Sequence, residues 1–316
     1  MLICGLLTAA PAPAGGPATQ APSEMDAEQL EKVLELHRVE QQEVRLVLLP
    51  AVVTTRKGRP VRGLEASDFR LYEDHVPHEI RYFQTEDEEP VSIAFLLDLS
   101  GSMRQVGKLD EAKEAIRVFI DSLKLGDRFG LVGFADDQVA WITDFTDDRD
   151  DFLVRLRVQE AYGQTALFDA LAATPKLVDE RIRGRKAIVL ITDGYDNASK
   201  LNNFKSMNLA RAVGVPIYTV AFSTLAERLK PKGSISPGMA VLRRFSNETG
   251  GRLFSVADPD ELKEAVLEIQ EELRFQYVIG YHSMREVWDG GFRRITVELD
   301  RKGFEIRTRR GYYATP

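Results

Sequence analysis

The chain has 316 residues, 44% hydrophobic and 29% charged, as expected of a folded globular protein of about two domains. Its net charge of −7 would repel a phosphate backbone, which argues against general nucleic-acid binding. A single cysteine, Cys4, excludes an intramolecular disulfide and a Cys-rich zinc site, and four scattered histidines argue against a histidine-based metal site. Any metal chemistry must therefore use oxygen ligands. No apolar run reaches the ~18 residues of a membrane span, so we expect no transmembrane segment in the mature chain.

Residues 1–25 have the composition of a signal-like or disordered tail. A short apolar run is followed by Ala, Pro and Gly, with two Ala-x-Ala patterns between Ala10 and Ala14. These features are typical of the end of a secretory signal peptide, although the basic start and longer apolar stretch of a complete signal are missing. We expect an exported or secreted protein, located in the periplasm, the cell envelope or the extracellular space. The alternative is a disordered tail on a cytoplasmic protein.

Residues 26–89 are expected to form an N-terminal flank of one short helix and several strands. Apolar residues have helical spacing over 26–39, and from residue 44 the period changes to two. The flank is predicted to hold strands near 44–53, 69–73 and 79–84, a hairpin turn at 74–77 and an acidic linker at 86–89.

Residues 90–274 alternate apolar runs with helical patterns. The run at 91–97 is almost continuously apolar, as in strands buried on both faces of a parallel sheet. Further strands are expected at 128–134, 139–142, 187–192, 217–222 and 253–256, and helices at 109–124, 149–160, 168–180, 204–213, 240–248 and 259–274. This alternation predicts an α/β fold with a doubly wound, mostly parallel sheet. Pro175 is expected to kink or break its helix.

After residue 274 the pattern returns to a period of two, so residues 275–316 are expected to form C-terminal strands. Neither this group nor the N-terminal flank makes a stable sheet alone, since small isolated sheets are marginal in water. We therefore predict that both flanks pair in one small β-sandwich, into which the α/β domain is inserted.

Three polar segments stand at predicted strand ends or loops of the α/β domain. Asp98, Ser100 and Ser102 follow the first buried strand as an Asp-x-Ser-x-Ser pattern. Thr165 stands before a helix, and Asp193 follows the strand at 187–192. In an open α/β sheet the carboxyl ends of the strands are where ligands bind. Each segment alone is also explained as a helix cap or a turn, so the prediction depends on the set.

In these segments the chain resembles a von Willebrand factor type A domain, the fold also found as the integrin inserted domain. The resemblance covers about residues 91–274, and the three segments match the metal-ion-dependent adhesion site of that family in order and spacing. Thr165 lies 67 residues after Asp98, and Asp193 lies 95 after it. The resemblance implies that Asp98, Ser100, Ser102, Thr165 and Asp193 bind a metal ion.

The wider chain is similar to bacterial proteins related to von Willebrand factor type A, in which outer segments flank the same central domain. The similarity rests on Gly63-Leu64 with Asp68-Phe69, on Gln276-Tyr277 and on Arg310-Gly311-Tyr312-Tyr313. These flanking motifs are far less specific than the metal motif. The chain departs from the family pattern at Pro175 and in a long basic loop at 224–238.

Three hydroxyls and two carboxylates form an all-oxygen site, which suits Mg²⁺ or Mn²⁺. Because hydroxyls neutralise no charge, such an ion stays electrophilic and can accept an Asp or Glu carboxylate from a partner protein. A helix beginning near Lys108 would direct its positive end to the same place. Neighbouring side chains are expected to form a rim that touches the partner: Met103, Arg104, Tyr162, Gln164 and Tyr195.

These features predict a non-enzymatic adhesion or assembly module with no catalytic residue. The first alternative is a metal-assisted hydrolase or phosphotransferase, but the Asp-x-Asp of related phosphatases is absent, since Ser100 holds the place of the second acid. Nucleophile-elbow and P-loop motifs are absent too. A metal-free structural scaffold is the second alternative, and it predicts no Mg²⁺-dependent change in melting temperature.

Overall fold

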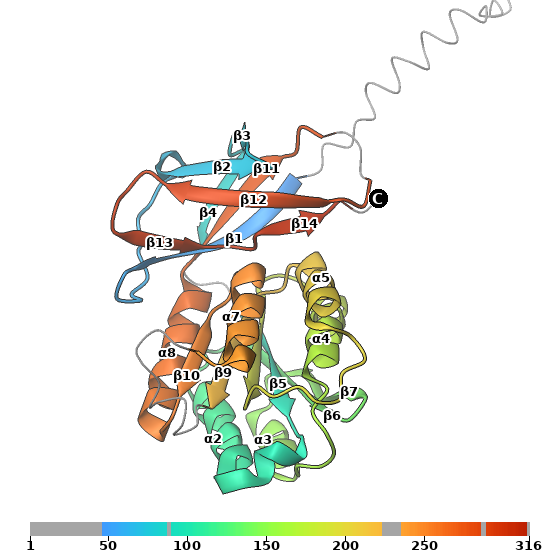
Figure 1. Ribbon diagram of the computed structural model, residues 1–316. Coiled ribbons are helices and arrows are strands. Elements are labelled where there is room, and N and C mark those ends of the chain that lie inside the picture. Colours follow the sequence, from blue (N-terminus) through green and yellow to red (C-terminus); the bar gives the residue numbers. More distant parts are fainter. Residues whose placement is uncertain (1–45, 87–89, 223–234, 286–288, 315–316) are drawn as a thin grey trace, which may run out of the picture. The chain divides into compact units, whose positions relative to one another are not determined.

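The computed structural model describes residues 46–86, 90–222, 235–285 and 289–314, which form three β-sheets and the helices between their strands (Figure 1). The predicted tail at 1–25 and helix at 26–39 lie outside the described residues, as does most of the loop at 224–238. Within the described ranges, none of the helices combines the length and apolar character needed to cross a membrane.

The central sheet has six strands in the order β10-β9-β8-β5-β6-β7. All neighbouring pairs are parallel except β6 and β7, so the predicted mostly parallel sheet is confirmed. Every residue of β5 is buried, as its continuous apolar pattern predicts. The strands are β5 (Ser92–Asp98), β6 (Arg128–Ala135), β7 (Gln138–Thr146), β8 (Lys186–Thr192), β9 (Ile217–Phe222) and β10 (Leu253–Val256).

Helices cover both faces of this sheet, and each face has its own apolar core. Alternate β5 residues point to opposite faces: Phe95 and Leu97 pack with α2, α3 and α8, whereas Ala94 and Leu96 pack with α4, α5 and α7. The helices are α2 (Lys108–Asp121), α3 (Arg149–Arg157), α4 (Leu167–Arg181), α5 (Asn203–Val213), α7 (Pro237–Thr249) and α8 (Pro259–Arg274). With both faces covered, the strand ends are the part of the sheet open to a ligand.

The two flanks of the α/β domain pair with each other in two four-stranded antiparallel sheets, β13-β1-β11-β4 and β14-β12-β2-β3. Strand β1 lies between β11 and β13, and β12 pairs with β2, so the predicted sandwich of N- and C-terminal strands is confirmed. Leu49, Leu71, Ile279 and Ile295 belong to its common core. The strands are β1 (Leu46–Thr55), β2 (Phe69–Glu73), β3 (Val76–His78), β4 (Tyr82–Glu86), β11 (Gln276–His282), β12 (Phe292–Leu299), β13 (Phe304–Arg307) and β14 (Gly311–Tyr313).

The hairpin after β2 is tighter than the sequence predicts. Asp74 and His75 both adopt left-handed backbone conformations, with φ of 47° and 70°, the pattern of a two-residue type I′ turn. The chain therefore re-enters the sheet at Val76 as β3, and the strand predicted at 79–84 lies at 82–86. Pro77 fits because β3 is an edge strand, where one backbone N–H can be missing.

Helix α4 continues through Pro175, so the predicted break of this helix does not occur. Pro175 is buried, and the hydroxyl of Thr174 donates to the Ala170 carbonyl oxygen at 2.7 Å. The buried proline ring contributes apolar burial, which opposes the cost of the missing backbone hydrogen bond.

Deletion of residues 275–316 should unfold the N-terminal strands and leave the α/β domain folded. The deletion removes both neighbours of β1, the β11 neighbour of β4 and the β12 neighbour of β2. We expect proteases to cleave rapidly within residues 46–86 and slowly within 90–274, as read by mass spectrometry of timed digests. Equal resistance of residues 46–86 in the deleted and full-length chains would contradict the pairing.

Candidate metal-binding site

Asp98 is the last residue of β5 and is fully buried, so its carboxylate lies at the carboxyl end of the central strand. Both of its oxygens accept hydrogen bonds. The backbone N–H of Ser100 donates to Oδ1 at 2.9 Å, and the Thr192 hydroxyl, at the end of β8, donates to Oδ2 at 2.6 Å. The carboxylate is therefore fixed between two neighbouring strands.

Ser100 and Ser102 present adjacent hydroxyls directly after Asp98. The chain leaves β5 into a 3₁₀ helix, η2 (Gly101–Gly107), and this turn brings Ser100 Oγ within 3.0 Å of Ser102 Oγ. Ser100 is fully buried, and Ser102 is half-buried. Two hydroxyl oxygens at this spacing can face the same ligand.

The loop that carries Thr165 lies against the loop after β5. The Gly101 N–H donates to the Gly163 carbonyl oxygen at 3.0 Å, which joins the two loops. Thr165 is only 2% exposed. Its backbone N–H donates to Asn197 Oδ1 at 2.8 Å, and its carbonyl oxygen accepts from the Asn197 N–H at 3.0 Å. Thr165 is thus held between the first and third predicted segments.

Position 163 favours glycine over any residue with a side chain. Its φ of 66° is left-handed, and an added Cβ would overlap the carboxylate of Asp136. Asp136 in turn fixes the loop, because its Oδ1 accepts from the Gln164 N–H at 2.7 Å. The sequence predictions missed both Asp136 and Asn197, whose roles depend on contacts between distant segments.

Asp193 follows β8 and lies beside Asp98 closely enough that its charge helps to raise the pKa of Asp98. Its side chain is 2% exposed. Lys108 Nζ donates to Asp193 Oδ2 at 3.0 Å, whereas Asp193 Oδ1 is buried and has no hydrogen-bond partner among the described residues. A buried carboxylate oxygen without a partner is a position where a cation would be stabilised.

The electrostatics of the site favour a positive ion. Burial raises the pKa of Asp98 to about 6 and the charge of Asp193 adds to the increase, while the hydrogen bonds from Ser100 and Thr192 oppose it. The described residues contain no group of three or more His, Cys, Asp or Glu side chains arranged for a metal, so an ion here would depend on hydroxyl ligands as well. The oxygen set therefore fits Mg²⁺ or Mn²⁺.

Four of the five predicted rim residues are exposed, and one is not. Tyr162 and Tyr195 are 42% and 57% exposed, Gln164 is exposed, and Arg104 is exposed with its Nε donating to the Ala161 carbonyl oxygen at 2.7 Å. Met103 is completely buried in the apolar core beneath α2, so its prediction as a rim residue is wrong. The η2 turn directs this side chain inward, whereas the next residue, Arg104, is exposed.

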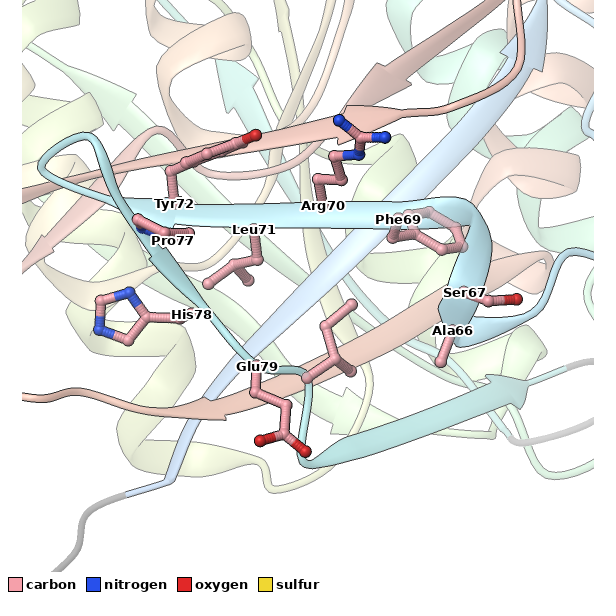
Figure 2. A pocket seen from close by; sticks show the side chains of 10 residues that line it. Ala66, Ser67, Phe69, Arg70, Leu71, Tyr72, Pro77, His78 and Glu79 are labelled. Carbon is pink, nitrogen blue, oxygen red and sulfur yellow. The ribbon is translucent and has the colours of Figure 1, made fainter.

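A hollow of about 390 Å³ lies beside β2 and β3 in the sandwich (Figure 2). Figure 2 shows Arg70 and Tyr72 on one side of β2 and Leu71 on the other. The polar groups there bind within the fold: Arg70 pairs with Asp300 at 2.8 Å, and His78 Nε2 accepts from the Met284 N–H at 3.3 Å. Arg70 and His78 therefore serve contacts within the fold, and we assign no function to this hollow.

The family model of the von Willebrand factor type A domain matches residues 93–195, which contain all five predicted ligands. An uncharacterized protein of Borreliella burgdorferi is 28% identical over 231 residues, which are 66% of this chain and 62% of that protein. A UPF0353 protein of Mycolicibacterium gilvum is 24% identical over 209 residues, 60% of this chain and 62% of that protein. The chain therefore spans about three fifths of the length of these relatives.

Among solved structures, a von Willebrand factor type A protein from Catenulispora acidiphila aligns with a TM-score of 0.50 and 17% identity, over 87% of this chain and 64% of that one. At this identity the similarity concerns the fold alone. Residues 93–195 therefore match the von Willebrand factor type A domain in sequence, and the six-stranded sheet has the fold of that domain.

Proposed function

We propose that this protein is a metal-dependent protein-binding module of the adhesion or assembly type. In this proposal Asp98, Ser100, Ser102, Thr165 and Asp193 hold Mg²⁺ or Mn²⁺, and the bound ion recruits an Asp or Glu carboxylate of a partner protein. The observation that supports it most is Asp193 Oδ1, a buried carboxylate oxygen without a partner among the described residues, in a site built from hydroxyls and a second carboxylate.

The ligands divide into two kinds with different tasks. Asp98 and Asp193 supply the negative charge that attracts a divalent ion, and the hydroxyls of Ser100, Ser102 and Thr165 supply neutral oxygens. When bound, the ion would supply a positive centre that is not fully neutralised and can accept an incoming carboxylate. We assign no catalytic step to these residues.

The exposed rim would determine which carboxylate binds. Arg104 adds a positive charge, and its side chain is held in place by the Ala161 carbonyl oxygen. Tyr162 and Tyr195 present exposed aromatic rings, a residue type enriched at protein interfaces. The proposed partner therefore carries an acidic residue next to an apolar or aromatic one.

The compartment belongs to the proposal as well. The signal-like composition of residues 1–25 supports export to the periplasm, cell envelope or extracellular space of a bacterium, where an adhesion or assembly module would meet its partner. Cell fractionation of the full-length chain would test this placement.

A peptide library can test the function even though the partner is unidentified. Random peptides would be panned on the immobilised protein in Mg²⁺ and eluted with EDTA. We expect the eluted peptides to share an Asp or Glu whose replacement by Asn or Gln abolishes binding. Peptides that bind equally in Mg²⁺ and in EDTA, or that keep binding without the acid, would contradict the proposal.

A further inference from the structure

We propose that Lys108 is a built-in counter-ion that competes with the metal ion for Asp193 and thereby sets how tightly the site binds Mg²⁺. The inference rests on the proposed function, and it assigns a role to a residue outside the five predicted ligands. Lys108 acts here through Asp193, as a residue that tunes the site.

The contact between the two side chains is well shielded from water. Lys108 Nζ lies 3.0 Å from Asp193 Oδ2, and the side chains are 17% and 2% exposed. Shielding strengthens an ion pair relative to the half-exposed pairs elsewhere on the surface, such as Arg117 with Asp121. Lys108 therefore donates to one of the two carboxylate oxygens with which Asp193 could bind a metal ion.

The position of Lys108 in the first turn of α2 is not one that this helix favours for a cation. Lys108 is the first residue of α2, where the partial positive charge of the helix end disfavours a cation. Asp110 and Glu111, in the same first turn, are the residue types that suit this end. The contact with Asp193 places a carboxylate opposite the Lys108 ammonium group, which the first turn of α2 does not do.

One lysine leaves the site incompletely neutralised. Asp98 is bound by the Ser100 N–H and the Thr192 hydroxyl, which are neutral donors, while the Lys108 ammonium group pairs with Asp193. A divalent ion could neutralise the charge of both carboxylates. When it approaches Asp193, the Lys108 ammonium group must either move away or stay close to a second positive charge. Either outcome weakens metal binding, so Lys108 opposes the ion and stabilises the metal-free protein.

The test compares Lys108→Met with the wild-type chain and with Lys113→Met. Lys113 lies on the same helix and donates to the Arg157 carbonyl oxygen, so its replacement changes the net charge equally without touching Asp193. Mg²⁺ affinity would be measured by isothermal titration calorimetry, and the melting temperature would be measured in EDTA. Lys108→Gln, which keeps a hydrogen-bond donor without the charge, serves as a second variant if Lys108→Met does not fold.

We expect Lys108→Met to bind Mg²⁺ about tenfold more tightly, a change of about 1.4 kcal/mol, and to melt at a lower temperature in EDTA, while Lys113→Met matches the wild type. Unchanged or weaker Mg²⁺ binding by Lys108→Met would overturn the inference and leave the proposed function intact. If neither the wild type nor Lys108→Met binds Mg²⁺, both the inference and the proposed function fail.

Discussion

Asp98→Asn is expected to lower Mg²⁺ affinity at least about 100-fold, because it removes one of the two charges of the proposed site. The same change should leave the metal-free protein at least as stable as the wild type. The new amide keeps an oxygen for the Ser100 N–H, and the Thr192 hydroxyl can rotate to accept from its nitrogen. It also removes a buried carboxyl group whose ionised form is disfavoured by burial, which is why the pKa of Asp98 is raised.

Thermal unfolding with and without Mg²⁺ would measure both parts of this prediction. Mg²⁺ should raise the melting temperature of the wild type, because it binds the folded state, and should leave the melting temperature of Asp98→Asn unchanged. Asp137→Asn is the matched control, since Asp137 forms an exposed pair with Lys200 and is not one of the proposed ligands. A Mg²⁺-induced stabilisation of Asp98→Asn equal to that of the wild type would exclude Asp98 as a ligand.

Asp127→Ala is expected to cause the largest loss of folding stability, about 3–5 kcal/mol, of the order measured when one partner of a buried ion pair is removed. The Asp127 side chain is 1% exposed and pairs with Arg274 at 2.6 Å, at the end of α8. It also accepts from the Val91 N–H at 3.0 Å and the Lys124 N–H at 2.8 Å. Alanine would leave the guanidinium and two backbone donors without their acceptor.

Urea denaturation followed by circular dichroism would test this effect against Asp121→Ala. Asp121 also pairs with an arginine, Arg117, but both side chains are about half exposed, and pairs of this kind contribute about 0–1 kcal/mol. The Asp127→Ala midpoint should therefore fall far below that of Asp121→Ala. Similar urea midpoints for the two variants would show that burial of the Asp127–Arg274 pair adds little to the stability of the fold.

The sequence predicts most of the fold because its local signals and its packing agree. Helix α8 illustrates this: Asp258 precedes it as an N-cap, Pro259 is its first residue, and Asp258 Oδ1 accepts from the Asp260 and Glu261 N–H groups. The turn after β2 is harder to predict, since Asp74 and His75 adopt left-handed conformations that glycine usually marks. Local propensity therefore suggests a longer loop there.

For the site, the sequence predicts which segments meet but not every contact between them. Strand ends at one edge of the sheet bring Asp98 and Asp193 together, as the pattern indicates. The bond between Lys108 and Asp193 joins residues 85 positions apart, and no local pattern marks it. The prediction for Met103 fails for the opposite reason, because adjacency in sequence does not reveal that η2 turns this side chain into the core.

An anomalous-scattering map of crystals soaked in Mn²⁺ would locate the bound ion. We expect one strong peak at the carboxyl end of β5, bounded by the hydroxyls of Ser100, Ser102 and Thr165. An empty map at that position, with Mn²⁺ bound elsewhere or not at all, would show that these loops do not form a metal-binding site.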